Sequence, residues 1–419
     1  MSKRGLPLTR RQGLLAALGA AVTQARADAR LDPLAALTQG AAAPLSGLVL
    51  RLQRGPQVLA EGAWGWRRLG AQPLPMQMDT RLRIASISKL ALALALLRLH
   101  EAGRLDLDAD LGRWLGTPLR HPLHRQTPIS ARLLLTHQSS LQDPDQPTQP
   151  DGAALRRSWA DPAHWHPAAP GSRFAYCNFA FALLATAMEA ACGERFDALM
   201  QRWLFGPLGI RPGYDVALMR PAERQRLATL YRRGAQGWEP QTDDWPLPTQ
   251  PRWSRHQQPG QNGSSFAPQG GLRINLPELA RIAQLLQQRG RWQGHALISP
   301  TGFASLLQPS WVHRAGDGAD TLGGLFRAWG LGLQIFADVH DAEGGDRLHP
   351  RGGWRAYGHL GEAYGLLSGL LFQPADGQQP GWSLLYAFNG TLAQPERGRH
   401  SSFSRCEELV LETLLGQLR

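Results

Sequence analysis

Lysine is almost absent from this chain of 419 residues, which carries nearly all of its positive charge on arginine. The sequence holds 45 lysines and arginines together, yet only Lys3 and Lys89 are lysines. An arginine side chain keeps its proton throughout the physiological pH range, whereas a lysine loses its proton when burial lowers its pKa. A position that remains lysine in such a chain is therefore a candidate for proton transfer.

Cysteine is scarce as well, with only Cys177, Cys192 and Cys406 in the whole sequence. An odd number of cysteines cannot pair completely within one chain, so a disulfide-rich scaffold is excluded. The first two flank an apolar run over residues 179–191, and a helix there would separate them by about 20 Å, too far for a disulfide. We expect free thiols that are mostly buried.

Clustered charge and long apolar runs are also missing. The formal net charge is +12, and it falls to +7 without the five basic residues of segment 1–27. The remaining arginines are scattered, which excludes a basic nucleic-acid groove and favours an ordinary solvated surface. Beyond segment 1–27 no run approaches the roughly 20 apolar residues of a membrane span, so we expect no membrane-spanning helix there.

The histidine pairs 121/124 and 164/166 lack acidic partners, and we expect neither a metal ion nor a cofactor.

Residues 1–27 have the pattern of an export signal. The pair Arg10-Arg11 precedes an apolar run, Gly13–Val22, and the small-x-small sequence Ala25-Arg26-Ala27 follows as a cleavage site. The run is too short to span a bilayer, which predicts a removable signal, and the paired arginines favour the twin-arginine route. An amphipathic first helix is the alternative. We expect a periplasmic or secreted protein.

Ser86 lies three residues before Lys89 in a predicted helix over Ile84–His100. Two side chains at this spacing share one face of a helix, so the amine can take the serine's proton as the hydroxyl attacks a carbonyl. The apolar neighbours Ile87 and Leu90 would desolvate the lysine and lower its pKa. A chance Ser-x-x-Lys pair is the alternative, which the scarcity of lysine argues against.

A second motif, Tyr176-Cys177-Asn178, follows about ninety residues later in a turn before an apolar helix. Tyr176 could relay a proton to a leaving group, and Asn178 could bind a substrate amide. Taken alone, the motif fits a half-buried turn tyrosine better than a site.

A third motif, from Gly358 to Gly365, lies on a predicted strand and contains His359, Gly361 and Glu362. Gly361 would let a substrate lie close to the backbone. The N–H of Glu362, with that of Ser86, could form an oxyanion hole. A lone histidine on a strand is more often structural, so this motif depends on the other two.

The order and separation of these three motifs resemble the serine β-lactamase and penicillin-binding protein superfamily. The likeness is greatest to the class C β-lactamase branch, with its D-alanyl-D-alanine carboxypeptidase and esterase relatives. Smaller segments at 129–141, 270–280 and 386–390 agree, and the resemblance covers nearly all of residues 45–415. It implies an α/β (α+β) fold: an antiparallel sheet flanked by N- and C-terminal helices, with an inserted helical domain.

Strand patterns at the two ends of the chain agree with that fold. Ser46–Arg54 and Gln57–Gly65 have strand character, and further strand patterns return between residues 330 and 389. We therefore expect a sheet domain from residues 28–105 and 271–419, with residues 106–270 inserted as the helical domain. The long polar segment Trp238–Gly271 is expected to be a loop that shapes the site or moves.

The resemblance implies an acyl-enzyme on Ser86, with proton transfer by Lys89 and Tyr176 and no cofactor. The classical β-lactamases of this branch carry Lys-Thr-Gly where this chain has His359-Leu360-Gly361. A histidine there is only partly charged at neutral pH, and Glu362 would repel anions, which disfavours a lactam carboxylate.

We therefore expect a small-molecule, peptide or ester substrate, with cell-wall fragments among the possibilities, and a serine hydrolase acting on amide or ester bonds. Two alternatives remain: a true class C β-lactamase, and a non-catalytic envelope protein that uses the same fold to bind a ligand. The second has no need of an intact Ser86, Lys89 and Tyr176.

Overall fold

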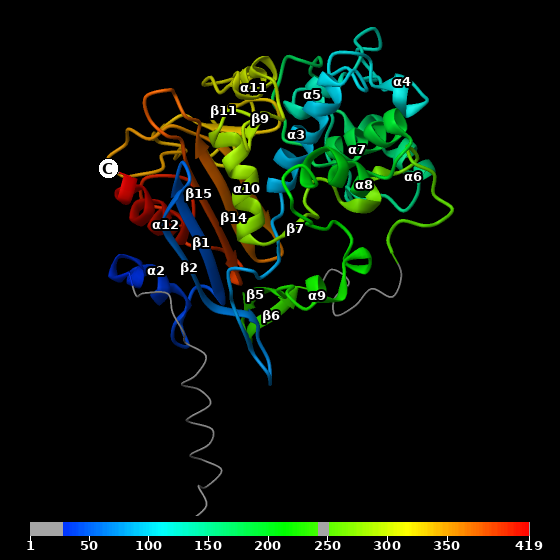
Figure 1. Ribbon diagram of the computed structural model, residues 1–419. Helices are drawn as coiled ribbons and strands as arrows, with labels where there is room; N and C mark the ends of the chain where they lie inside the picture. The colour runs from blue at the N-terminus through cyan, green and yellow to red at the C-terminus, as the bar shows by residue number, and fades with distance from the viewer. Residues whose placement is uncertain (1–27, 242–250, 419) are drawn as a thin grey trace, which may run out of the picture.

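A computed structural model describes residues 28–241 and 251–418 of the chain. Its centre is an antiparallel sheet in the order β10-β11-β12-β13-β14-β15-β1-β2-β3 (Figure 1). The strands are β1 (Gly47–Arg54), β2 (Gln57–Arg68), β3 (Leu74–Pro75), β10 (Trp311–Val312), β11 (Ala328–Trp329), β12 (Gln334–Phe336), β13 (Ala356–Ala363), β14 (Leu366–Gln373) and β15 (Trp382–Asn389). Because β1 pairs with β15 along its whole length, the two ends of the chain build one sheet, as the strand patterns predicted.

Side chains that alternate along the strands give this sheet two apolar faces. On β1, Leu48 and Leu50 pack on one face and Val49 packs on the other. The first face is covered by α2 (Asp32–Ala35) and α12 (Arg405–Leu415), which come from the two ends of the chain (Figure 1). The second face is covered by α10 (Leu276–Gln287). The predicted antiparallel sheet with flanking terminal helices is confirmed.

Helix α3 (Ile87–Glu101) lies between the sheet and the remaining helices. Its leucines and alanines are buried on every side because it contacts β13 and β14 on one side and α7 (Phe179–Cys192) on another. The other helices are shorter: α4 (Gly112–Leu115), α5 (Ala131–Leu135), α6 (Gly152–Ala160), α8 (Phe196–Met200), α9 (Pro221–Arg224) and α11 (Pro300–Leu307). Of these, α4, α5 and α8 contact α7. None of the helices within 28–241 and 251–418 is long and apolar enough to cross a membrane.

Short strand pairs complete the fold and correct one prediction. The segment that was expected to be a loop begins with β6 (Gly237–Gln241), which forms a hairpin with the preceding β5 (Leu230–Gly234), and β5 also pairs with β16 (Thr391–Leu392). Two further pairs are β4 (Leu82–Arg83) with β7 (Arg273–Ile274), and β8 (Arg291–Trp292) with β9 (His295–Ala296). Residues 242–250, like the predicted signal 1–27, lie outside the described residues.

The end of that same segment is buried rather than exposed. A 3₁₀ turn at Gly263–Phe266 packs on α7, and the Gly263 N–H donates to Thr186 Oγ1 at 2.9 Å. Its polar residues pair with one another, as Ser264 does with Asn262. Polar composition indicated a loop, but internal hydrogen bonding lets these residues be buried.

The three cysteines are free thiols, as predicted, although only Cys177 is fully buried. Cys192 and Cys406 are half-buried, so the expectation of buried thiols is wrong for these two. The reason is their position, since Cys192 ends α7 and Cys406 lies in the first turn of α12.

Candidate active site

Ser86 immediately precedes α3 and is half-buried. The residue before it, Ala85, has a φ of +46°, in the left-handed region that is unfavourable for residues with a Cβ. The turn is held by Ser88, whose Oγ donates to the Ala85 carbonyl at 2.6 Å. The chain therefore enters the helix through a sharp bend that presents the Ser86 hydroxyl at the surface of a cleft.

The Lys89 side chain lies beneath Ser86 and is completely buried. Its Nζ donates to three oxygens: Ser86 Oγ at 2.9 Å, Asn178 Oδ1 at 2.7 Å and the Gln269 carbonyl at 2.9 Å. Nζ also lies 4.9 Å from the centre of the Tyr176 ring. Burial lowers the pKa of Lys89 from 10.5 to about 7, because a charged ammonium is poorly solvated there.

The three partners of Nζ differ in what they can do for a neutral amine. The oxygens of Asn178 and Gln269 are carbonyl oxygens, which only accept hydrogen bonds, whereas a serine hydroxyl also donates. An unprotonated Lys89 would keep its two N–H bonds on the carbonyls and direct its lone pair at Ser86. The arrangement can therefore remove the hydroxyl proton of Ser86 during attack.

Asp143 sets the orientation of the Asn178 amide, and sequence reasoning missed it. Its Oδ2 accepts from Asn178 Nδ2 at 2.7 Å, and its Oδ1 accepts from the N–H of Phe179, the first residue of α7, at 2.7 Å. With the nitrogen held by a carboxylate, the amide oxygen has to face Lys89. The negative charge of Asp143 also opposes part of the burial effect on the pKa of Lys89. The only signal in the sequence is a carboxylate two residues after the segment 129–141.

Tyr176 is hydrogen-bonded to Ser86 and fixed by stacked rings on both sides. The His137 ring lies 4.4 Å from it at 28°, and the Phe326 ring lies 5.4 Å from it at 25°. Burial raises the pKa of Tyr176 above its ordinary value of 10, so the phenol keeps its proton at neutral pH. It can therefore act as a hydrogen-bond donor, and as a proton donor to a leaving group.

His359 lies on β13 and is only 2% exposed. Its Nδ1 is 2.6 Å from the Leu360 carbonyl, which places a proton on Nδ1, and its Nε2 has no partner among the described residues. Burial, and next the positive charge of Lys89, lower the pKa of His359 to about 3. The expectation of a partly charged histidine is thus wrong, because the ring is buried beside a cation and stays neutral.

Gly361 brings β13 against the chain that leads into the nucleophile. A Cβ at this position would lie 2.4 Å from the carbonyl oxygen of Ile84 and 2.4 Å from Ser368 Oγ. Only glycine allows this approach, which places the backbones around Ser86 and Glu362 next to each other. The predicted reason for this glycine was access for a substrate. The structure adds close packing between two segments of the protein itself.

A cleft of about 570 Å³ joins these residues. It is lined by six of the seven residues predicted as a site, namely Ser86, Tyr176, Asn178, His359, Gly361 and Glu362, and the seventh, Lys89, bonds Ser86 from below. Its lining also includes Asp320, Arg397 and Ser404. The exposed charged side chains in this lining are the carboxylates of Glu362 and Asp320 and the guanidinium of Arg397, so negative charge is in excess.

One group among the described residues has the composition of a metal site and lies outside this cleft. His400, Glu408 and Glu412 place potential ligand atoms within 4.8 Å of one another. The Arg405 guanidinium bonds both carboxylates, at 2.9 and 3.0 Å, and already supplies a positive charge to them. We assign no metal to it.

Two curated hydrolases are similar in sequence to part of this chain. The D-alanyl-D-alanine-carboxypeptidase/endopeptidase AmpH of Escherichia coli is 33% identical over 183 residues, which cover 41% of this chain and 46% of AmpH. Esterase EstB of Burkholderia gladioli is 33% identical over 238 residues, covering 52% of this chain and 57% of the esterase. This chain thus matches about half the length of these two curated relatives.

Among solved structures, the hydrolase EstCE1 superposes with a TM-score of 0.65 at 21% identity, over 92% of this chain and 97% of that one. The D-amino acid amidase of Ochrobactrum anthropi gives 0.63 at 18% identity, over 93% and 98% of the two chains. These likenesses confirm the fold. The sequence model of the family described as Beta-lactamase matches residues 34–401, and the chain therefore belongs to the beta-lactamase family.

Proposed function

We propose that this protein is a serine hydrolase that cleaves amide or ester bonds through an acyl-enzyme on Ser86. The observation that carries the proposal is the set of three contacts around Lys89 Nζ, two of them to carbonyl oxygens and one to the nucleophile. A lysine whose pKa is about 7 has the free amine available at neutral pH. Membership of the beta-lactamase family supports the same function.

In the proposed reaction the Ser86 oxygen bonds to the substrate carbonyl carbon while its proton moves to Lys89. The N–H groups of Ser86 and Glu362 stabilise the oxyanion. Tyr176 gives its proton to the departing amine or alcohol, and the proton held on Lys89 restores the phenol. Water then attacks the acyl-enzyme, which releases the acid and regenerates the Ser86 hydroxyl.

The charges of the cleft favour neutral or cationic substrates over anionic ones. His359 is neutral, and the exposed carboxylates of Glu362 and Asp320 repel an anion. The curated relatives include a carboxypeptidase, an esterase and the D-aminopeptidase of Cereibacter sphaeroides, which is 31% identical over 196 residues. We propose small amides, esters or D-peptides as the substrate class, with cell-wall fragments among them.

A true β-lactamase is the second candidate, and Arg397 is the observation in its favour. This arginine is the cleft residue that could attract a lactam carboxylate. Its Nη2, however, already donates to the Glu343 carbonyl at 2.6 Å and lies 3.3 Å from both the Gly323 carbonyl and Ser402 Oγ. Part of the hydrogen-bonding capacity of the Arg397 guanidinium is therefore used within the protein.

A ligand-binding protein without catalysis would not need a desolvated lysine on the serine. Burying an amine lowers the stability of the fold, and ligand binding alone gives no reason for that loss.

We further propose export by the twin-arginine route, on the strength of Arg10-Arg11 and the apolar run that follows.

The test is intact-mass analysis after incubation with a fluorescent penicillin and, separately, with p-nitrophenyl acetate, combined with turnover assays. We expect a covalent adduct or turnover in the native protein and neither in Ser86→Ala. Ser172→Ala, an exposed serine outside the cleft, is the matched control and should behave like the native protein. Absence of both adduct and turnover across a panel of esters, lactams and D-peptides would favour the binding protein instead.

A further inference from the structure

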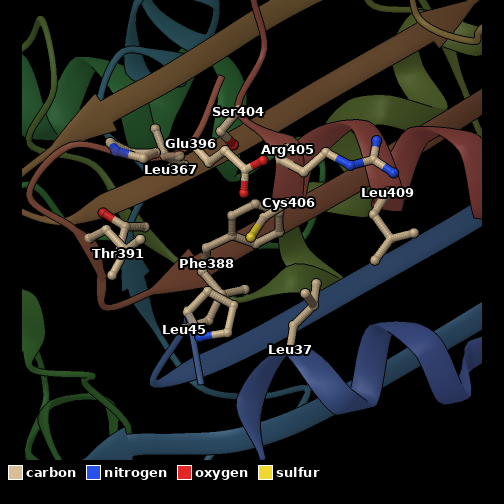
Figure 2. A pocket seen from close by; sticks show the side chains of 13 residues that line it. Leu37, Leu45, Leu367, Phe388, Thr391, Glu396, Ser404, Arg405, Cys406 and Leu409 are labelled. Atoms are coloured by element: carbon tan, nitrogen blue, oxygen red, sulfur yellow. The ribbon is translucent and has the colours of Figure 1, made fainter. Parts of the chain in front are cut away.

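A second cavity, of about 180 Å³, lies between the segment 37–45 that follows α2, the adjoining ends of β14 and β15, and α12. Figure 2 shows Leu37, Leu45, Phe388 and Cys406 facing one another around it, with Glu396 and Arg405 toward one side. Leu367 and Leu409 complete the apolar part of the wall.

The sheet register places this cavity close to the proposed oxyanion residue. Glu362 on β13 is directly opposite Leu367 on β14, which is in turn directly opposite Phe388 on β15. Residues opposite each other in an antiparallel sheet point to the same face and lie about 5 Å apart. Phe388 is therefore about 10 Å from Glu362, on the same face of the sheet.

The two cavities also share walls. Leu367, Pro395 and Ser404 line both the cleft of Ser86 and the second cavity. A group that leaves the cleft past Leu367 would enter the apolar space directly, because these three residues form the border between the two.

Apart from Glu396 and Arg405 at one side, the lining favours an uncharged hydrocarbon group. Burial raises the pKa of the Cys406 thiol to about 11, so this thiol faces the space in its neutral form. The Arg405 guanidinium is neutralised by Glu408 and Glu412, at 2.9 and 3.0 Å. An apolar cavity of about 150 Å³ is enough to hold a benzene ring, so the space fits one aryl group or a short alkyl chain.

We propose that this apolar cavity is a subsite for a hydrocarbon substituent of the substrate, an aryl or short alkyl group on the amide or ester that Ser86 attacks. The occupant is part of the substrate itself, because the cavity adjoins the cleft and is too small for a protein segment. This inference rests on the proposed hydrolytic function and adds the substituent that the enzyme prefers.

The kinetic test compares p-nitrophenyl esters from acetate to octanoate, together with acetate esters of alcohols of rising length. In the native protein kcat/KM should rise about two- to fourfold per methylene group in one of the two series, until the cavity is full. Cys406→Trp fills the space and should abolish this rise. Val312→Trp adds the same ring at an exposed position outside both cavities and should keep the native profile.

A flat profile in both series of the native protein, or a rise that survives in folded Cys406→Trp, would overturn the subsite. Binding to Ser86→Ala, measured by calorimetry, separates this result from failure of the hydrolase proposal. In at least one of the two series, the longer ester should bind more tightly than the acetate, and Cys406→Trp should remove the difference even if no turnover occurs. Equal binding of the two esters in Ser86→Ala would count against the subsite whatever the hydrolytic activity.

Discussion

Lys89 and Asn178, which are 89 positions apart in the sequence, are joined by a hydrogen bond of 2.7 Å from Nζ to Oδ1. The other end of the Asn178 amide is held by Asp143, so both polar groups of this side chain have protein partners. Asn178 was predicted to bind a substrate amide, and that role stays a prediction. A substrate could reach the second lone pair of Oδ1 and the second N–H of Nδ2, since the protein uses one of each.

Substitution of Lys89 tests whether its proton transfer matters more than its charge. Lys89→Arg keeps a positive charge that cannot be lost, and Lys89→Met keeps similar bulk without charge. Both should lower kcat/KM for p-nitrophenyl acetate by about 10²–10⁴-fold, the range for loss of a general base. Near-UV circular dichroism checks that each variant is folded. An arginine variant with more than a tenth of native activity would contradict the assignment.

The pH dependence of kcat/KM should show an acid limb near pH 7. The pKa of Lys89 is lowered by burial to about 7, and the protonated amine cannot accept the proton of Ser86. The rate should therefore fall tenfold per unit well below that value and level off above it. His359 should add no limb between pH 5 and 9, because its pKa is about 3. A single limb centred near 10 would mean that Lys89 is not desolvated during the reaction.

Removal of the Asp143 charge should displace that limb to lower pH. Burial lowers the pKa of Lys89, and the Asp143 carboxylate offsets part of that effect. In Asp143→Asn the pKa of Lys89 should therefore be lower than in the native protein. The same change weakens the hold on the Asn178 amide, and kcat should drop as well. Asp145→Asn, at an exposed aspartate two residues later, is the matched control. If the two variants share one pH profile, Asp143 does not act through Lys89.

Neutralising Glu362 should shift selectivity toward anionic substrates. In Glu362→Gln, the ratio of acylation rates for a fluorescent penicillin and for p-nitrophenyl acetate should rise about two- to fivefold, as expected for an exposed charge. Half-molar salt should shrink the effect, because it screens charges at the surface. A ratio that stays constant at low salt would show that the Glu362 carboxylate does not face the substrate.

Local patterns in the sequence were sufficient for the main elements of the fold. Segments of strand character predicted β1 and β15, and the apolar segment 84–100 predicted the helix that the structure shows as α3. The hairpin β5–β6 was not predicted from the sequence because its strands are short and polar. It is stabilised by pairing with β16, some 160 residues later. When two strands that are far apart in the chain pair, the sequence pattern of neither strand indicates the pairing.

The proposed nucleophile and its lysine could be selected from the sequence because they lie on one helical turn, where spacing alone brings two side chains together. The turn and strand motifs were placed with them by their order along the chain. What the sequence by itself determined is thus the set of reactive groups and the two-ended sheet that carries them.

Only the tertiary structure decided how those groups are protonated and held. The neutrality of His359, the lowered pKa of Lys89 and the role of Asp143 all follow from burial and from contacts between segments far apart in the chain. The apolar cavity near Phe388 likewise arises where the segment 37–45 and α12, from opposite ends of the chain, meet over one face of the sheet. Solvent exclusion and electrostatic neighbours are properties of the packed molecule, so no local pattern could have supplied them.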